Sequence, residues 1–302
     1  MPEEGGRSQG AASVPPIRPS ARPPVTRFAP SPTGWLHLGH VANAVWTWET
    51  ARRHGARVLL RMEDHDRGRC RPEYERQIYE DLAWLALTPE PESAASLLAG
   101  RSPWRQSDCS AVYEAALDRL ARAGLVYGCD CSRSSIAAQA GDGAEGAERR
   151  YPGTCRDRGL PVGPGVGVRI RLPETEEAFD DLRLGLQRQR PHEQCGDLLA
   201  RDRHGNWTYQ FTVTVDDLRH GVDLVVRGED LLESTGRQIL LARLLGREAP
   251  PRFLHHPIIR NETGVKLSKK DRAMGLREMR EAGLTATQLI AEARQRTGWG
   301  EK

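Results

Sequence analysis

Apolar and polar positions near the start of the chain follow the order strand, loop, helix and strand. A short apolar run at 25–29 precedes a loop, and a helical pattern at 40–55 places its apolar residues on one face and ends at Gly55. The run "ARVLLRMED" at 56–64 predicts a buried strand that ends in carboxylates. Because this order is typical of a βαβ unit, we expect an α/β fold with a parallel sheet.

The pattern further along predicts more helices and a return to buried strands. One helix opens at Pro72, and another begins with Ser107 as its cap and ends at Gly124. The alternating runs "GVGVRIRL" and "FDDLRLGLQ" predict small antiparallel strands. Buried strands are predicted for "NWTYQFTVTVDD" and "GVDLVVRGEDL", an amphipathic helix for "LLESTGRQILLARLLG", and two short helices for the last part of the chain.

A change of texture after residue 128 divides the predicted fold into two halves and an insert. The following residues combine short alternating runs, turn residues and a Gly/Ala stretch, which favours a small inserted subdomain. We therefore expect a disordered tail at 1–24, the first half of the main domain at 25–128, the insert at 129–196, the second half at 197–270 and a short helical region at 271–302.

Composition changes this picture little. The 302 residues carry a formal net charge of +3, which permits an anionic partner without requiring one. No apolar run approaches the length of a membrane span, and residues 1–24 lack the apolar stretch of a secretory signal, so we expect a cytoplasmic protein. The six cysteines do not predict a disulfide framework, and the limited apolar surface favours a monomer.

The loop "RFAPSPTGWLHLGH" at 27–40 is the first candidate for chemistry. A helix that starts after a parallel strand directs its N–H groups and its positive dipole end toward an anion such as a triphosphate. His37 and His40 share the first turn and can donate hydrogen bonds to phosphate oxygens that gain charge, while Gly39 admits a ligand close to the backbone. Taken alone, such a pair favours a Pro/Gly loop with two solvated histidines.

The histidine loop is accompanied by a second element. "PSPTGWLHLGH" resembles the HIGH motif of class I aminoacyl-tRNA synthetases, in the form of the glutamyl and glutaminyl branch, and "KLSKK" at 266–270 resembles their KMSKS loop, which closes over the ATP phosphates. "RMEDHD" and "VDDLRHGVDLVVRGEDLLEST" are also similar to the glutamyl branch, and the resemblance spans about residues 25–285. It implies a Rossmann-like catalytic domain that activates L-glutamate with ATP and Mg²⁺.

The resemblance also implies roles for individual residues. The glutamate carboxylate attacks the α-phosphorus of ATP and pyrophosphate leaves, so no side-chain nucleophile is required. Catalytic roles are implied for His37, His40, Lys266 and Lys269, with ATP contacts from His37, Gly39, His40 and Lys269. Glutamate contacts are implied for Arg27, Phe28, Ala29, Pro30, Ser31, Glu63, Tyr209 and Arg227.

The residues by themselves support these glutamate contacts unequally. Glu63 is also compatible with a solvated carboxylate at a strand end, and Tyr209 with a core position. Arg227 is harder to explain as core, because it follows the apolar run "DLVV" and an unpaired buried guanidinium is costly.

Three cysteines form a candidate metal site. Cys129, Cys131 and Cys155 lie close together in the sequence, and thiolates prefer Zn²⁺. From this spacing alone, zinc binding and three reduced cysteines are about equally favoured. The resemblance adds Tyr151 as the fourth ligand of a structural zinc ion, since the pattern C-x-C followed by Y-x-x-x-C is present.

The length of the chain bears on the acceptor of the glutamyl group. Only 32 residues follow Lys270, too few for the anticodon-binding region of a full glutamyl-tRNA synthetase. This arrangement resembles the glutamyl-Q tRNA(Asp) synthetases, which are stand-alone catalytic domains. Members activate glutamate without needing their tRNA and transfer it to queuosine at the wobble position of tRNA(Asp).

Other functions stay open on the sequence. A truncated glutamyl-tRNA synthetase would charge tRNA(Glu), and an inactive paralogue would act as a binding protein. A nucleotidyltransferase or ligase with a small-molecule acceptor would use the same fold. The motifs favour class I chemistry more strongly than they favour any one acceptor.

Overall fold

The structure is a computed structural model that describes residues 22–139, 150–260 and 274–300. The first half of the main domain contains β1 (Val25–Phe28), α1 (Leu38–His54), β2 (Arg57–Leu60), α2 (Pro72–Trp84), α3 (Pro91–Leu98) and α4 (Ser110–Arg122). The middle contains β3 (Val126–Cys129), α5 (Arg133–Gln139), β4 (Gly167–Ile170), β5 (Glu177–Asp181), β6 (Gly185–Gln189), α6 (Pro191–Cys195) and β7 (Leu198–Arg201). The last part contains α7 (Tyr209–Arg219), β8 (Leu224–Gly228), α8 (Thr235–Leu244), β9 (Arg252–His256), α9 (Leu276–Glu281) and α10 (Ala286–Thr297).

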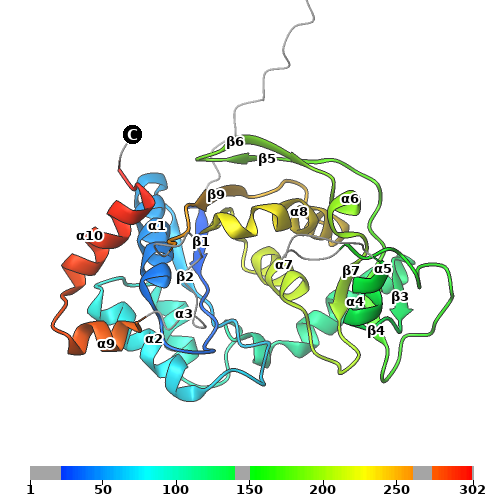
Figure 1. Ribbon diagram of the computed structural model, residues 1–302, viewed down its shortest axis with the longest axis horizontal. Helices are drawn as coiled ribbons and strands as arrows, with labels where there is room; N and C mark the ends of the chain where they lie inside the picture. Colours follow the sequence, from blue (N-terminus) through cyan, green and yellow to red (C-terminus); the bar gives the residue numbers. More distant parts are fainter. Residues whose placement is uncertain (1–21, 140–149, 261–273, 301–302) are drawn as a thin grey trace, which may run out of the picture.

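The predicted βαβ unit and its parallel strands are confirmed. β1 and β2 pair in parallel with α1 between them in the chain, and α1 ends at Gly55 in the left-handed conformation. β8 and β9 form a second parallel pair. The backbone N–H of Asp223 donates to the carbonyl of Val25 at 2.9 Å, which joins the start of β8 to β1. In Figure 1, β1, β2 and β9 lie close together left of the centre, with α1 and α10 packed together on their outer side.

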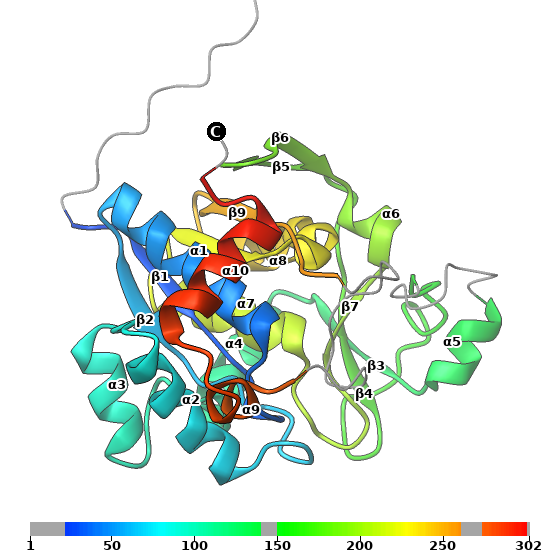
Figure 2. The same ribbon diagram turned by 60° about the vertical axis from the view of Figure 1, so that its left-hand side comes forward.

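A separate antiparallel sheet follows the first half of the main domain, and its limits and content differ from those predicted for the insert. β3, β4 and β7 form an antiparallel sheet that begins at Val126 and ends at Arg201, outside the predicted limits of 129 and 196. The hairpin β5–β6, predicted inside the insert, instead pairs with β9 through Asp181 and Phe253. The alternating pattern identified both hairpin strands but carried no information about their partner. Figures 1 and 2 show the hairpin extending over the main domain.

The strand predicted for "NWTYQFTVTVDD" is wrong, because its last part forms helix α7. Alternating Thr and Val favour a strand, but here the threonine hydroxyls donate hydrogen bonds to backbone carbonyls one turn earlier in the helix. Thr212 Oγ1 donates to the carbonyl of Thr208 at 3.2 Å, and Thr214 Oγ1 donates to that of Gln210 at 2.8 Å. The helix is buried from Phe211 to Asp217, so tertiary packing overrides local propensity.

Smaller differences concern where elements begin and how deeply they lie. Ser107 is not the cap of α4, which begins at Ser110; the Ser107 backbone N–H donates instead to Asp64 at 2.8 Å. β2 ends at Leu60, whereas the predicted strand continues to the carboxylates Glu63 and Asp64. Helix α8 is buried from Thr235 to Ala242 and not amphipathic, because α7 and β5 both pack against it. Among the described residues, no helix is both long and apolar enough to span a membrane.

Candidate active site

The first turn of α1 is capped by the two loop histidines. His37 is the N-cap residue, and its Nδ1 accepts a hydrogen bond from the Gly39 backbone N–H at 3.1 Å. His40 Nδ1 accepts from the backbone N–H of His37 at 3.1 Å. Because both Nδ1 atoms are acceptors, each neutral ring carries its proton on Nε2 and presents an N–H donor there. The helix therefore begins at Leu38, slightly before the predicted start at residue 40.

A cavity of about 580 Å³ opens beside this capped turn. Its wall includes His37, Gly39 and His40 on one side and residues after β8 and β9, such as Asp230 and Ile259, on the other. Gly39 has a second reason to lack a side chain, since a Cβ there would lie 2.9 Å from Cε1 of His37. The helix N-terminus and two imidazoles thus line one cavity, and these groups suit a bound anion.

Most residues predicted to contact glutamate line the same cavity. Burial, together with the nearby Glu63 carboxylate, raises the pKa of Tyr209 to about 12, so its hydroxyl stays a neutral donor near pH 7. Arg27 and Arg227 are almost completely buried, and each directly precedes a residue of the cavity wall. The predicted residues in the wall are Phe28, Ala29, Pro30, Ser31, Glu63 and Tyr209.

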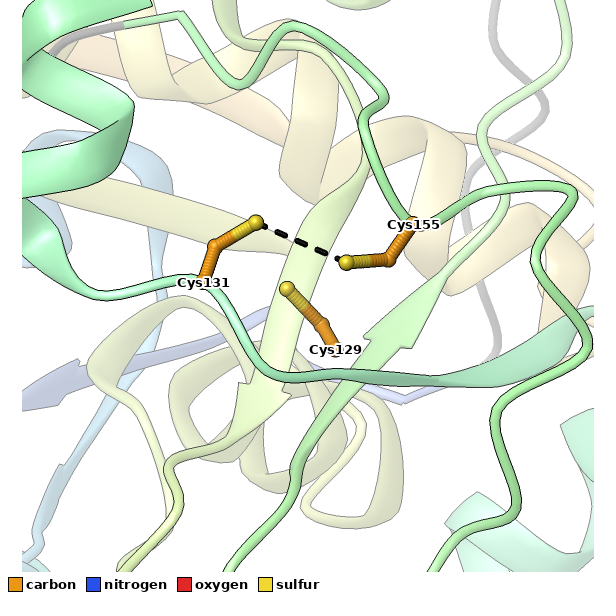
Figure 3. Close-up of side chains that lie close together, drawn as sticks. All are labelled: Cys129, Cys131 and Cys155. Carbon is orange, nitrogen blue, oxygen red and sulfur yellow. Dashed lines mark hydrogen bonds between the residues drawn. The ribbon is translucent and has the colours of Figure 1, made fainter.

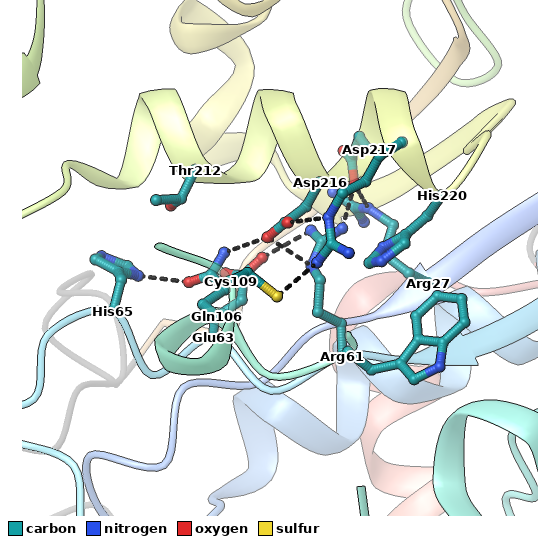
Figure 4. A network of polar contacts seen from close by, with 12 residues as sticks. Arg27, Arg61, Glu63, His65, Gln106, Cys109, Thr212, Asp216, Asp217 and His220 are labelled. Atoms are coloured by element: carbon teal, nitrogen blue, oxygen red, sulfur yellow. Dashed lines mark hydrogen bonds and ion pairs between the residues drawn. The ribbon is translucent and has the colours of Figure 1, made fainter. Parts of the chain in front are cut away.

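A buried network of charges fixes one side of this site (Figure 4). Asp217 on α7 accepts from Arg27 Nε at 3.0 Å and from Arg61 Nη1 at 2.7 Å. Arg61 Nη2 also donates to Glu63 Oε1 at 2.8 Å. The Glu63 carboxylate, which lines the cavity, is therefore held from behind by a fully buried guanidinium.

The network predicts how stability depends on pH. Burial would raise the pKa of Asp217, but Arg27 and Arg61 outweigh it and hold that pKa well below its usual range. A depressed folded-state pKa contributes stability that is present above the unfolded pKa of about 4 and is lost as the pH falls further. We expect the unfolding free energy of the Asp217→Asn variant to depend less on pH than that of the wild type below about pH 4. Urea unfolding at pH 7, 5, 4 and 3 measures this pH dependence. If the unfolding free energies of both proteins fall equally with pH, Asp217 does not have the proposed effect.

Arg227 has a different environment from the other buried arginines. Its Nε donates to His255 Nε2 at 3.0 Å, one terminal nitrogen to Gln238 at 2.6 Å, and the other to Thr235 at 2.8 Å. Burial lowers the pKa of Arg227 below its usual value. A guanidinium nevertheless stays protonated near pH 7. Arg227 is therefore a buried cation beside the cavity, and its hydrogen-bond partners among the described residues are neutral.

The predicted lysines Lys266 and Lys269 lie outside the described residues, as does the whole "KLSKK" motif. The described residues on either side of that segment are close to the site. Ile259 lines the cavity. Gly275 pairs with His37 as a short antiparallel bridge, and the Leu276 backbone N–H donates to the Leu36 carbonyl at 2.7 Å.

The three predicted cysteines lie together at the end of the inserted sheet (Figure 3). The sulfur atoms of Cys129, Cys131 and Cys155 all lie within 4.8 Å of one another. A tetrahedral zinc ion places its sulfur ligands about 3.8 Å apart, so these atoms could hold one with small adjustments. Cys129 Sγ donates to the Tyr151 hydroxyl oxygen at 3.5 Å, so the predicted fourth ligand lies beside the same cluster.

Two arginines provide positive charge around the cysteine cluster. Arg169 Nε donates to Cys129 Sγ at 3.3 Å, and its guanidinium lies 3.5 Å from the centre of the Tyr151 ring. Arg158 Nη1 donates to Cys155 Sγ at 3.4 Å. Such donors stabilise thiolates and offset the excess negative charge of three thiolates around one divalent ion. Positive charge therefore lies beside two of the three sulfur atoms, those of Cys129 and Cys155.

The α/β fold, the capped helix and the cavity agree with the catalytic domain of a class I aminoacyl-tRNA synthetase. The chain belongs to the family described as tRNA synthetases class I (E and Q), catalytic domain, whose profile matches residues 24–302. Membership in this family makes the chain a ligase by class and confirms the family resemblance seen in its motifs.

Individual relatives narrow the similarity to the glutamate branch. A glutamyl-Q tRNA(Asp) synthetase from Rhodobacter capsulatus is 40% identical over 276 residues, which cover 86% of this chain and 95% of that protein. A glutamate–tRNA ligase from Frankia casuarinae is 39% identical over 258 residues, which cover 85% of this chain but 52% of the ligase.

A solved structure gives the same result. The glutamate tRNA ligase from Elizabethkingia meningosepticum in complex with its amino acid matches with a TM-score of 0.68 and 26% identity. The match covers 87% of this chain and 54% of that protein, so this chain spans about half the length of the solved ligase.

Several site residues were not predicted from the sequence. Arg61 and Asp217 lie in runs that resemble the glutamyl branch, but the sequence assigns neither residue a role, and Asp217 meets Arg27 from 190 positions away. No local spacing indicates such a contact. His255 and His256 follow one another in "FLHHP", and this pair of buried histidines beside an apolar run was a signal that could have been used.

Proposed function

We propose that this chain activates L-glutamate with ATP and transfers the glutamyl group to queuosine at the wobble position of tRNA(Asp). The observation that carries the choice of acceptor is the identity of the relatives. Glutamyl-Q tRNA(Asp) synthetases are 40%, 41% and 44% identical to this chain over 276, 274 and 256 residues, against 39% over 258 residues for a glutamate–tRNA ligase. This similarity supports queuosine ahead of the 3′ end of tRNA(Glu).

The first step joins glutamate to AMP. The α-carboxylate of glutamate attacks the α-phosphorus of ATP, and the bond to the leaving pyrophosphate breaks. His37 and His40 are suited to donate from Nε2 to phosphate oxygens, since their Nδ1 atoms already accept backbone N–H groups. Lys266 and Lys269 are proposed to stabilise the leaving pyrophosphate as point charges, and Mg²⁺ accompanies ATP.

Glutamate is proposed to bind at the bottom of the cavity. Its ammonium group matches the Glu63 carboxylate, which Arg61 holds in place. Its side-chain carboxylate matches the buried cation of Arg227, with the neutral Tyr209 hydroxyl as a further donor. Arg27 adds positive charge beside the loop of Phe28 to Ser31. The pocket therefore provides a cation for the one carboxylate that does not react.

Exchange of label between pyrophosphate and ATP tests the activation step. We expect exchange that depends on L-glutamate, needs no tRNA and is far weaker with L-glutamine, because glutamine lacks the second carboxylate. Exchange that is equal for both amino acids, or absent with glutamate, would contradict the proposed activation.

We further propose that the cysteine cluster holds a structural zinc ion through Cys129, Cys131, Cys155 and Tyr151. Three sulfur atoms within 4.8 Å support this, as do the guanidinium donors of Arg158 and Arg169. A closed set of four protein ligands leaves no open position for a substrate, so the ion would stabilise the inserted sheet and take no part in glutamate activation.

Metal analysis of purified variants tests the zinc site. We expect about one zinc per chain in the wild type, loss of zinc and a lower melting temperature in Cys155→Ser, and weaker zinc retention in Tyr151→Phe. Cys70→Ser is the matched control, because Cys70 lies outside the cluster. Equal zinc content in Cys155→Ser and Cys70→Ser would rule the site out.

A further inference from the structure

A buried chain of hydrogen bonds leads from the turn of the β5–β6 hairpin to Arg227. Asp181 Oδ2 lies 2.6 Å from Nδ1 of His255, and the His255 backbone N–H donates to the same oxygen at 3.0 Å. The opposite ring nitrogen, Nε2, accepts from Arg227 Nε at 3.0 Å. The side chains of Asp181 and His255 are both completely buried. Asp181 and Arg227 therefore hold the imidazole from both sides.

The donors in this chain determine the protonation of His255. A guanidinium has only N–H donors, so Nε2 of His255 must be the acceptor in its contact with Arg227. The proton must then lie on Nδ1, where it is donated to the Asp181 carboxylate. Burial lowers the pKa of His255, which agrees with a neutral ring. The imidazole thus offers Arg227 an acceptor without a negative charge.

Asp181 is itself held in one orientation. Its other oxygen, Oδ1, accepts the backbone N–H groups of Arg183 and Leu184, both at 2.9 Å. These bonds fix the hairpin turn and the carboxylate together. Asp181 can therefore select the ring orientation and tautomer of His255, since its two oxygens have separate fixed partners.

The charge of Arg227 is left available by this arrangement. Arg27 is paired with Asp217, whereas the hydrogen-bond partners of Arg227 in the described chain are His255, Gln238 and Thr235, all neutral. These bonds use three of the five N–H donors of a guanidinium and leave one on each terminal nitrogen. A carboxylate can accept from two such donors at once. These hydrogen bonds therefore orient the guanidinium without forming an ion pair with it.

We propose that His255, held by Asp181, is a positioning residue that aligns Arg227 for the side-chain carboxylate of glutamate. This inference rests on the proposed function, in which Arg227 binds that carboxylate. A carboxylate in the place of His255 would orient Arg227 equally well, but it would compensate the charge that the substrate needs. A neutral acceptor therefore serves selection of glutamate better than an ion pair does.

Two substitutions at His255 test the role of the neutral acceptor by pyrophosphate exchange. His255→Leu removes the acceptor, and we expect the KM for glutamate to rise roughly 10- to 100-fold, as for loss of a hydrogen bond to a charged group. The KM for ATP and the kcat should stay within about threefold, because none of the residues in this chain of hydrogen bonds is proposed to contact the nucleotide. His255→Gln supplies an amide oxygen to Arg227 and an N–H to Asp181, and should recover most of the affinity for glutamate.

A third variant keeps the shape of the site and reverses its polarity. Asp181→Asn presents an amide N–H group to Nδ1 of His255, which favours a proton on Nε2 instead. The N–H group on Nε2 would then point at the N–H group of Arg227 Nε, and the hydrogen bond between these two nitrogens would be lost. We expect a raised KM for glutamate here as well, with the melting temperature of each variant measured alongside.

The outcomes separate this inference from the proposed function. If the wild type shows no glutamate-dependent exchange, the proposed function fails and the inference fails with it. If Arg227→Leu loses glutamate while His255→Leu and Asp181→Asn keep the wild-type KM, the inference alone is wrong. Parallel changes in the KM for glutamate and for ATP would also overturn it, since they would indicate a general loss of structure.

Discussion

The Arg61→Met variant is expected to lose about 3–5 kcal/mol of its unfolding free energy, which is the typical effect of removing one partner from a buried ion network. Arg61 is completely buried and bonds both Asp217 and Glu63. Its Nε also lies 3.8 Å from Asp216. Methionine fills a similar volume, so the loss comes mainly from carboxylates left without a counter-charge.

Urea unfolding at pH 7 measures this effect, and Arg57→Met at the start of β2, the strand that ends just before Arg61, is the matched control. Arg57 is 44% exposed and lies 3.5 Å from Glu90, so its removal should change stability by less than about 1 kcal/mol. Similar losses in the two variants would show that the buried network does not contribute as described.

The Arg227→Leu variant is expected to reduce kcat/KM for glutamate in pyrophosphate exchange by roughly 10³-fold, as when one partner of a buried charge pair is truncated. Arg227 is 3% exposed, and its hydrogen-bond partners among the described residues are all neutral. Its replacement by leucine would remove the cation that is proposed to bind the substrate carboxylate. The KM for ATP should change little, because the histidine-capped turn is untouched.

Arg188→Leu is the control for the loss of an arginine as such. Arg188 lies on β6, is 61% exposed and pairs with Glu176, away from the cavity wall. We expect wild-type exchange from this variant and an unchanged KM for glutamate. A comparable loss of activity in Arg188→Leu, or full activity in Arg227→Leu, would contradict the assignment of the carboxylate site.

The sequence predicts those parts of the site that depend on short spacings. The βαβ unit follows from local periodicity, and the place of His37 and His40 at a helix start follows from their separation in a Pro/Gly loop. The cysteine cluster is another such case, because two of its cysteines are separated by one residue.

Contacts between distant segments are not predictable in this way. Asp217 reaches Arg27 only because the segment after Tyr209 is a buried helix, whereas its Thr/Val alternation favours a strand. The hairpin of β5 and β6 was recognised by its alternation, but its pairing with β9 depends on which sheet edge is available. The link from Asp181 to His255 follows from that pairing and has no signal in either segment alone.

The choice of acceptor is the central claim of the account, and the most direct test is ATP-dependent transfer of labelled glutamate to bulk tRNA. Two tRNA pools are compared, one from a strain that makes queuosine and one from a strain that cannot. We predict label only on the queuosine-containing pool, attached at the wobble position of tRNA(Asp). Equal labelling of both pools at the 3′ end would contradict the claim and identify the chain as an enzyme that charges tRNA.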